Sequence, residues 1–472
     1  MNDCPPPPAA PWRVYPFTLV PGDPEMIFPA AEGHQAVATD TYYASGILTG
    51  TASGHRYAFL TIFAKNEKIF SVLSADFFVF ALFDLETGRY DTASEFDLPP
   101  GHAINSDNIN VSQGRLEVSY TAGQRVSRFQ ARQTPAGELI PFAYELDLVG
   151  RGRTGAWMDL KLCADALKPP QAVGGSALGG RIRVMGQDDT HSYFQSLGYA
   201  GTLRWGGAEE AVAGSIGWLD RQWFPDYVGK SAGVLAERYG HQWSQLSLDN
   251  GWEFGLWRHF NRLSQDRVVP FSGLTATDPT GQTLFIDDYT IESLSYVRDP
   301  NLIKPLLADA QTATGIRAQT RYFFDAFRLR APSLGLEVVS APLVAAPAHL
   351  MPVDYFSGPT SLTGTMNGHS VAGFGFHERT LAFWKPRQLL VVLRDSLMHL
   401  PPEALANSPL SAEQLAARAW RAKPLIDRHR YLSARLHLNN KVRPTLAPIA
   451  VSHRGHLVRI LDDLIDQISF FS

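Results

Sequence analysis

The densest group of side chains with chemical potential lies in residues 217–223, where an aspartate stands between two tryptophans. On a β-strand alternate side chains face the same way, so Trp218, Asp220 and Gln222 would share one face. Leu219, Arg221 and Trp223 would share the other. An aspartate among aromatic neighbours inside a barrel is poorly solvated, which raises its pKa and makes it a general acid for an apolar substrate. The alternative is a purely structural Asp220, paired with a neighbouring arginine.

His191 and Tyr193 form a second candidate pair, about one strand pair earlier in the chain. They also share a face if the segment is extended. A histidine titrates near neutrality and can transfer protons, so His191 is a candidate proton acceptor. The alternative is a surface histidine that follows two aspartates.

A third group lies in the second half of the chain. His241, Trp243 and Gln245 alternate along one predicted strand, and Glu378 follows His377 on another. Glu378 could instead cap a strand end and pair with its neighbouring arginine. The predicted substrate contacts of the whole chain are Tyr193, Trp218, Gln222, Trp243, Gln245, Trp257 and Glu378, and the predicted catalytic residues are Asp220 and His191.

The elements that must position these residues are short apolar runs separated by turn residues, which is typical of an all-β sandwich or barrel. Two hairpins are predicted at Asn250-Gly251 and Asn367-Gly368, each with a tight type I′ turn. Residues 301–310 predict a short helix. Beyond about residue 400 the sequence becomes helical, beginning with a capping box at Ser411. These patterns predict a proline-rich arm (1–30), two β-barrels (31–238 and 239–398) and a helical tail (399–472).

Composition excludes several classes of protein. The net charge of −4 argues against general nucleic-acid binding. No apolar run reaches the roughly 18 residues of a membrane helix, and no signal peptide is evident, so we expect a cytoplasmic protein. We interpret the two cysteines, Cys4 and Cys163, as free thiols in a reducing compartment. The histidines are scattered, no phosphate-binding loop or nucleophile elbow is evident, and we expect no metal or other cofactor.

Four segments in order resemble the lipocalin-like carotenoid 1,2-hydratase (hydroxyneurosporene synthase) family, whose wider relatives include kievitone hydratase-like proteins and bacterial proteins described as secreted hydrolases. The segments are 42–48 with 57–59, 217–223, 243–251, and 355–358 continuing through Gly364, Gly373 and Glu378. The resemblance spans residues 40 to 395. The chain departs from it at Gln222-Trp223, where many members have Trp-Gly, and in its helical tail.

The resemblance implies two packed lipocalin-like barrels with a deep apolar pocket. It also implies a cofactor-free reaction on a hydrophobic, often isoprenoid or polyene, substrate. By this resemblance Asp220 would protonate an alkene, assisted by His191 and Tyr193.

Three functions follow as expectations. The first is a hydratase or cyclase, in which Asp220 protonates an alkene and water or an internal nucleophile quenches the cation. The second is a pericyclase that holds a polyene in a reactive conformation. The third is a non-catalytic carrier of an apolar ligand. The expected partner is a hydrophobic small molecule; peripheral membrane contact and a homodimer through the helical tail stay open.

Overall fold

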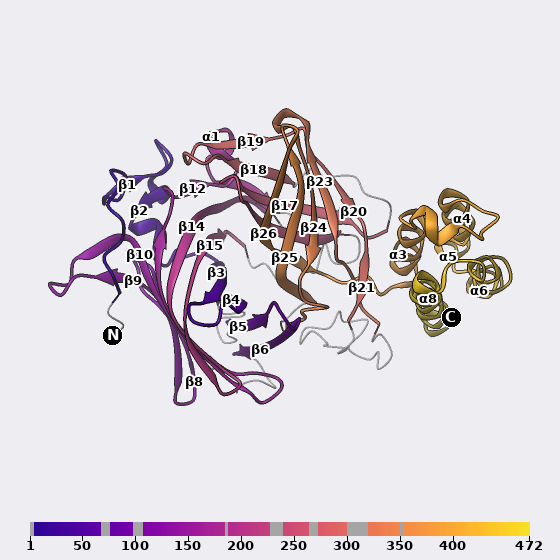
Figure 1. Ribbon diagram of the computed structural model, residues 1–472, viewed down its shortest axis with the longest axis horizontal. Helices are drawn as coiled ribbons and strands as arrows, with labels where there is room; N and C mark the ends of the chain where they lie inside the picture. Colours follow the sequence, from indigo (N-terminus) through magenta and orange to yellow (C-terminus); the bar gives the residue numbers. More distant parts are fainter. Residues whose placement is uncertain are drawn as a thin grey trace.

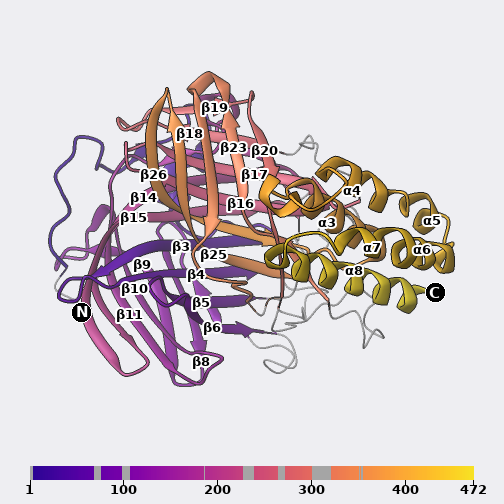
Figure 2. The same ribbon diagram turned by 45° about the vertical axis from the view of Figure 1, so that its right-hand side comes forward.

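The computed structural model describes residues 4–67, 76–97, 107–184, 187–226, 239–263, 272–299, 320–349, 351 and 354–472. Within these ranges the chain forms two large curled antiparallel sheets and a C-terminal helical segment (Figures 1 and 2). The predicted mainly-β architecture of two packed barrel-like sheets with a helical appendage is confirmed. The helix predicted for residues 301–310 lies outside the described residues.

The first sheet contains 13 strands within the described residues. Its neighbours run β6-β5-β4-β3-β15-β14-β11-β10-β9-β8-β7, with β12 and β13 pairing with β14 off this path. The strands are β3 (Thr39–Gly50), β4 (Arg56–Asn66), β5 (Phe77–Asp84), β6 (Arg89–Phe96), β7 (Ile109–Val111), β8 (Glu117–Ala122), β9 (Arg125–Gln133), β10 (Leu139–Arg151), β11 (Trp157–Ala166), β12 (Gln171–Ala172), β13 (Arg181–Val184), β14 (Gln187–Trp205) and β15 (Ala208–Phe224).

The second sheet contains nine strands in the order β19-β18-β17-β16-β26-β25-β24-β23-β20, again counted over the described chain. They are β16 (Tyr239–Leu248), β17 (Glu253–Asn261), β18 (Gly273–Thr277), β19 (Thr283–Ile286), β20 (Thr290–Ser293), β23 (Phe327–Ala331), β24 (Leu336–Pro342), β25 (Tyr355–Met366) and β26 (His369–Thr380). Two small two-stranded sheets complete the set: β1 (Phe17–Thr18) with β2 (Ile27–Phe28), and β21 (Tyr296–Arg298) with β22 (Tyr322–Phe324).

The three largest buried apolar clusters of the described residues hold these parts together. One fills the curl of the first sheet and brings strands from its two ends into contact, as in the stacked rings of Phe78 and Tyr120. A second fills the curl of the second sheet and continues into the helices. A third lies between the two sheets and includes Trp218 from the first sheet and Trp243 from the second. We call this third cluster the inter-sheet core.

The helical segment, residues 386–472, begins with α3 (Pro386–Met398), before the predicted start at residue 399. It continues through α4 (Ala412–Trp420), α5 (Lys423–Asp427), α6 (Tyr431–His437), the π-helix Leu438–Val442, α7 (Arg443–Leu446) and α8 (Val451–Phe471). Ser411 accepts from the backbone N–H of Gln414, as the capping box predicts. Buried Leu389 and Leu393 of α3 join the core of the second sheet. In the described chain, we find no helix with the length and apolar character to cross a membrane.

The N-terminal arm is attached by a covalent bond that the sequence analysis missed. Cys4 and Cys163 form a disulfide, with their Cα atoms 5.6 Å apart, so the interpretation as two free thiols is wrong. The fold brings the arm across β11, and Arg13 reinforces this placement by donating to the backbone oxygens of Pro141 and Phe142, each at 3.1 Å. The argument from free thiols to a reducing compartment therefore no longer holds.

The two predicted hairpins differ in their turns. Asn367 and Gly368 both have positive φ, at 51° and 78°, which confirms the type I′ prediction. In the other hairpin Gly251 has positive φ, at 85°, and Asn250 does not. Four residues therefore separate β16 from β17, and this connection is a longer loop rather than the predicted tight turn.

Candidate functional site

The alternation predicted for residues 217–223 is confirmed. Trp218 lies in the inter-sheet core, whereas Leu219 and Trp223 point into the curl of the first sheet. Asp220 follows the same parity as Trp218 and is 3% exposed. It therefore faces the second sheet, and the expectation that it faces into a barrel is wrong.

The electrostatic partner of Asp220 is Glu378 on β26. Burial, together with the negative charge of Glu378, raises the pKa of Asp220 to about 8. The amide nitrogen of Gln222, 3.5 Å from the carboxyl group, and the charge of Arg221 oppose the rise. Burial likewise raises the pKa of Glu378 to about 7, against a hydrogen bond donated by Tyr355. We call Asp220 and Glu378 the carboxyl pair.

Two tyrosines complete the surroundings of the carboxyl pair. Tyr43 is the direct strand partner of Asp220, and burial and the charges of both carboxylates raise the pKa of its phenol. Tyr355 donates its hydroxyl hydrogen to Glu378. Two neutral phenols and two acids whose pKa values lie near neutrality thus meet beside the apolar inter-sheet core. Such a layer can donate and accept protons without bulk water.

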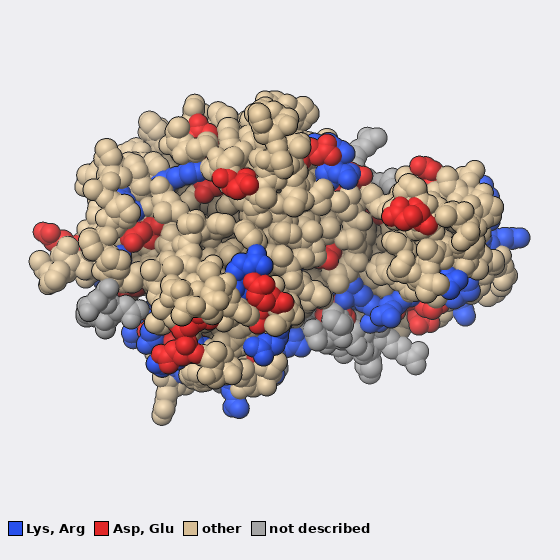
Figure 3. All heavy atoms as spheres, in the orientation of Figure 1, with Lys and Arg blue, Asp and Glu red and all other residues tan. Residues whose placement is uncertain are grey.

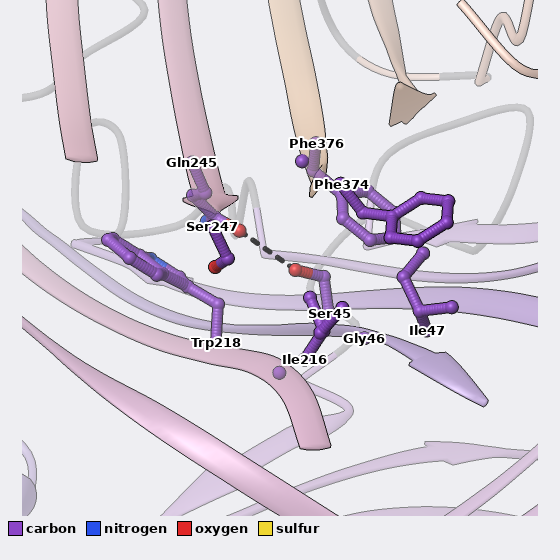
Figure 4. A pocket seen from close by; sticks show the side chains of 11 residues that line it. Ser45, Gly46, Ile47, Ile216, Trp218, Gln245, Ser247, Phe374 and Phe376 are labelled. Atoms are coloured by element: carbon purple, nitrogen blue, oxygen red, sulfur yellow. Dashed lines mark hydrogen bonds between the residues drawn. The ribbon is translucent and has the colours of Figure 1, made fainter. Parts of the chain in front are cut away.

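The carboxyl pair lies two residues along the strands from a small hollow between the sheets, which Figure 4 shows. Asp220 is two residues from Trp218 on β15, and Glu378 is two residues from Phe376 on β26. Two residues of a strand span roughly 7 Å. The hollow, which has room for about one water molecule and is partly open to solvent, is lined by Ser45, Gly46, Ile47, Ile216, Gly217, Trp218, Gln245, Ser247, Phe374, Gly375 and Phe376.

A hydrogen bond crosses the hollow. Ser45 of β3 donates to the side-chain oxygen of Gln245 of β16 at 2.8 Å, and Figure 4 shows it bridging the two sheets. Trp218 lies on one side of this bridge, and Phe374 and Phe376 lie on the other. None of the lining residues is ionisable. Ser45 pairs with Trp218 and Gln245 pairs with Phe376, so the bridge lies at the end of the hollow nearest to the carboxyl pair.

His191 and Tyr193 do not join this site. In the register of β14 and β15, Tyr193 pairs with Arg221 and Phe194 pairs with Asp220. Tyr193 therefore faces the curl of the first sheet, opposite to Asp220, and belongs to its core. The expected assembly of Asp220 with His191 and Tyr193 is wrong.

The cause is one extra residue in β15. Near the hairpin end of the two strands, Tyr199 pairs with Gly214. The next pair given by the register is Leu197 with Gly217, so two residues of β14 lie opposite three residues of β15. Without this bulge the register would pair Tyr193 with Asp220 and place both side chains on one face. A one-residue shift moves a whole run of side chains to the other face of a sheet. The bulge also borders the hollow, which Ile216 and Gly217 line.

The opposite face has its own polar contacts. The ring of His191 stacks on Trp223 with centroids 5.0 Å apart, and its Nε2 lies 3.2 Å from a carboxylate oxygen of Glu25. Arg221 forms a fully buried ion pair with Asp40. The structural alternative for Asp220, an ion pair with a neighbouring arginine, therefore fails, because Arg221 is paired on the other side of the sheet.

The remaining predicted contacts divide as follows. Trp243 and Trp257 lie in the inter-sheet core, Gln245 lines the hollow, and Gln222 lies 3.5 Å from Asp220 through its amide nitrogen. Sequence reasoning gave no role to Tyr43, Ser45 or Tyr355, which lie in segments that carry the family resemblance. Strand parity relative to Asp220 and Glu378 is the signal that would have identified them.

One group of carboxylates has the spacing of a metal site: Asp76, Asp97 and Asp107. The ammonium of Lys65 already lies 2.7 Å from carboxylate oxygens of both Asp76 and Asp107. This cation already bridges two of the three carboxylates, and we assign no metal to the group.

Comparison with known proteins supports the fold. No protein-family model and no curated protein sequence matches the chain. Among solved structures, a protein described as an AttH from Nitrosomonas europaea is similar, with a TM-score of 0.55 and 18% sequence identity. The likeness covers 77% of this chain and 98% of that one. The likeness supports a lipocalin-like fold for the two curled sheets of this chain.

Proposed function

We propose that the protein is an acid–base catalyst acting on an apolar small molecule held between the two sheets, with Asp220 as proton donor and Glu378 as proton acceptor. The observation that carries the proposal is the carboxyl pair itself. Two acids that burial shifts to pKa values of about 8 and about 7 lie beside one another in an aromatic layer. At neutral pH Asp220 is mostly protonated, and Glu378 is divided between its two forms.

The reaction class is proton-initiated addition to, or isomerisation of, a carbon–carbon double bond, as in a hydratase or cyclase of isoprenoid or polyene substrates. Asp220 gives its carboxyl proton to one alkene carbon and becomes a carboxylate. The cation at the other carbon is attacked by water or by an internal nucleophile, and Glu378 accepts the proton released. A proton passing from Glu378 back to Asp220 restores the starting state.

The neighbouring side chains suit this role. The faces of Trp218, Tyr43 and Trp243 line the same layer, and each aromatic face stabilises a nearby cation by roughly 0.5–2 kcal/mol. The hollow has room for about one water molecule, far less than the roughly 300–1,000 Å³ of most small-molecule sites. The two sheets must therefore move apart, and the Ser45–Gln245 bridge must open, before a substrate reaches the carboxyl pair.

One observation favours a second candidate. The residues that line the hollow are apolar, aromatic or neutral, and the acids lie one level away. A ligand that stays in the hollow would meet no proton donor. The protein would then be a pericyclase that holds a polyene, or a carrier.

Turnover in heavy water separates the candidates. Wild type, Asp220→Asn and Glu378→Gln are incubated with extracts of the source cells, with Glu209→Gln, an exposed hairpin variant, as control. Acid–base catalysis predicts a product with one new deuterium on carbon, absent with Asp220→Asn and unchanged with the control. A product free of carbon-bound deuterium, formed equally by Asp220→Asn, contradicts the proposal and favours the pericyclase. A ligand bound and released unchanged favours the carrier.

A further inference from the structure

The helical segment has a charge opposite to that of the rest of the chain. Residues 415–460 contain ten lysines and arginines and a single acid, Asp427, whereas the whole chain carries a net charge of −4. Asp427 already lies within 3.0 Å of both Arg387 and Lys423. Most of the remaining cations of this stretch, including Arg428, Arg430 and Lys441, have no carboxylate partner among the described residues. The positive charge of residues 415–460 is therefore largely uncompensated.

Large apolar side chains are exposed in the same segment. Of the eight exposed large hydrophobic residues in the described chain, four lie between residues 432 and 470. Leu432 and Leu436 are 68% and 52% exposed and stand four residues apart on α6, so they share one helix face. Nothing in the described chain covers them.

The cations and the leucines lie together. Arg428 and Arg430 immediately precede α6, and both are exposed. Lys441 lies in the π-helical turn Leu438–Val442, which follows α6 directly, and it is exposed. We call the set Arg428, Arg430, Leu432, Leu436 and Lys441 the α6 surface.

The α6 surface also has an accessible position. Helices α5 and α6 lie at the end of the molecule farthest from the first sheet in both ribbon views (Figures 1 and 2). Figure 3 shows Lys and Arg side chains along the lower and right-hand edges of the helical segment. A flat partner can therefore approach α6 without meeting either sheet.

We propose that the α6 surface docks the protein onto an anionic lipid bilayer. Exposed leucines flanked by arginines and lysines are the pattern of an interfacial helix, whose apolar side chains enter the boundary between headgroups and acyl chains while its cations attract anionic lipids. A nucleic acid would use the cations but gain nothing from two exposed leucines. A bilayer uses both, and it also dissolves apolar molecules of the kind proposed for the inter-sheet site.

The test is sedimentation of the full-length protein with vesicles. One set contains phosphatidylcholine with roughly 30% phosphatidylserine, and the other contains phosphatidylcholine alone. Only the first set has a negatively charged surface, so the difference between them measures the electrostatic part of the binding. We expect binding to the anionic vesicles alone, and we expect high salt to weaken it. Arg428→Glu/Arg430→Glu and Leu432→Ser/Leu436→Ser should each lower binding by about tenfold or more.

Matched controls come from the first and second sheets. Arg151→Glu/Lys161→Glu makes the same change in net charge, and Leu167→Ser/Leu284→Ser removes two leucines that are 46% and 37% exposed. Both controls should bind vesicles as wild type does. The assay needs no substrate, so its outcome is separate from that of the proposed reaction.

Three results would overturn the proposal. The first is no binding, or binding that the α6 variants and the controls change equally. The second is loss of binding with the arginine variant but not with the leucine variant, together with retention of an oligonucleotide, which indicates a nucleic-acid surface. The third is a dimer in light scattering that requires Leu432 and Leu436, without vesicle binding, which indicates a self-association surface.

Discussion

At the residue scale the most consequential feature is that Asp220 is buried as an acid and not as half of an ion pair. Arg221, its chain neighbour, is turned to the other face and paired with Asp40, while Asp220 faces the like-charged Glu378. Adjacent residues of one strand thus meet opposite electrostatic environments. This contrast sets two predictions, one for each residue.

The first prediction concerns stability against pH. The folded-state pKa of Asp220, about 8, lies above its usual 3.8, so the folded protein binds the proton more tightly than the unfolded chain. The stability linked to this group is complete below pH 4 and is lost as pH rises through 8. Asp220→Asn removes the dependence. The difference in Tm between Asp220→Asn and wild type should therefore increase in favour of the variant from pH 4 to pH 8, when measured by calorimetry.

Glu209→Gln serves as the control, because this residue is exposed and its change should leave the profile unaltered. A Tm difference for Asp220→Asn that stays constant over this pH range would show that Asp220 titrates normally.

The second prediction concerns Arg221. Its guanidinium lies 3.7 Å from the ring centroid of Tyr42, and it donates to the backbone oxygens of Glu32 and Gly33 besides pairing with Asp40. Arg221→Met leaves the carboxylate of Asp40 buried without its cation, which should cost about 3–5 kcal/mol of unfolding free energy. Chemical denaturation measures the loss. Arg204→Met, at an exposed ion pair, should leave the unfolding free energy nearly unchanged, and equal losses in the two variants would contradict the account.

At the element scale, the bulge in β15 decides which side chains form the site. The alternation of side chains along residues 217–223 could be predicted from the sequence, and so could the alternation at His191 and Tyr193. Whether Tyr193 and Asp220 face the same side of the sheet could not be predicted, because that depends on a one-residue change of register between Gly214 and Gly217. The facing of Asp220 toward the second sheet depends likewise on how two curled sheets pack, which no local pattern encodes.

The fold class was more accessible to prediction, because turn residues and strand periods are local. The Asn367-Gly368 turn has the expected positive φ at both positions. The Cys4–Cys163 bond could not be inferred, since the two residues are 159 apart in sequence and only the tertiary fold joins them.

Two glycine variants test how much backbone conformation alone contributes to stability. Gly368 has φ of 78° and a Cβ there would meet nothing within 4 Å, so Gly368→Ala costs stability through backbone conformation alone, by about 1 kcal/mol. Gly455 lies in α8, and a Cβ there also meets nothing within 4 Å. Gly455→Ala should therefore add up to about 1 kcal/mol through helix propensity. Unfolding in urea gives both values, and shifts of the same sign would contradict this interpretation.

At the scale of the whole molecule, distant segments are held against the two sheets by a few specific contacts. Lys168 of the first half lies 3.0 Å from Glu253 on β17, and Ser196 donates to the same carboxylate. The disulfide anchors the arm to β11, and the helices close the curl of the second sheet. The inter-sheet site thus depends on contacts between segments far apart in the chain.

The disulfide gives the prediction at this scale. The denatured, unreduced protein should react with no thiol reagent, because it has two cysteines and both are joined. Cys4→Ser/Cys163→Ser should lower the unfolding free energy by about 2–5 kcal/mol. Two reactive thiols per chain in protein purified without reductant would contradict the bond, and an unchanged Tm in the double variant would show that other contacts suffice to hold the arm.

The most direct test of the central claim is an infrared titration of Asp220. The difference spectrum between wild type and Asp220→Asn isolates the carbonyl stretch of this one carboxyl group. We predict a protonated carboxylic acid at pH 7 whose band disappears with a midpoint near pH 8, and a lower midpoint in Glu378→Gln, because that variant removes the neighbouring negative charge. A carboxylate already ionised at pH 6 would contradict the account and leave Asp220 without the proton that the proposed reaction requires.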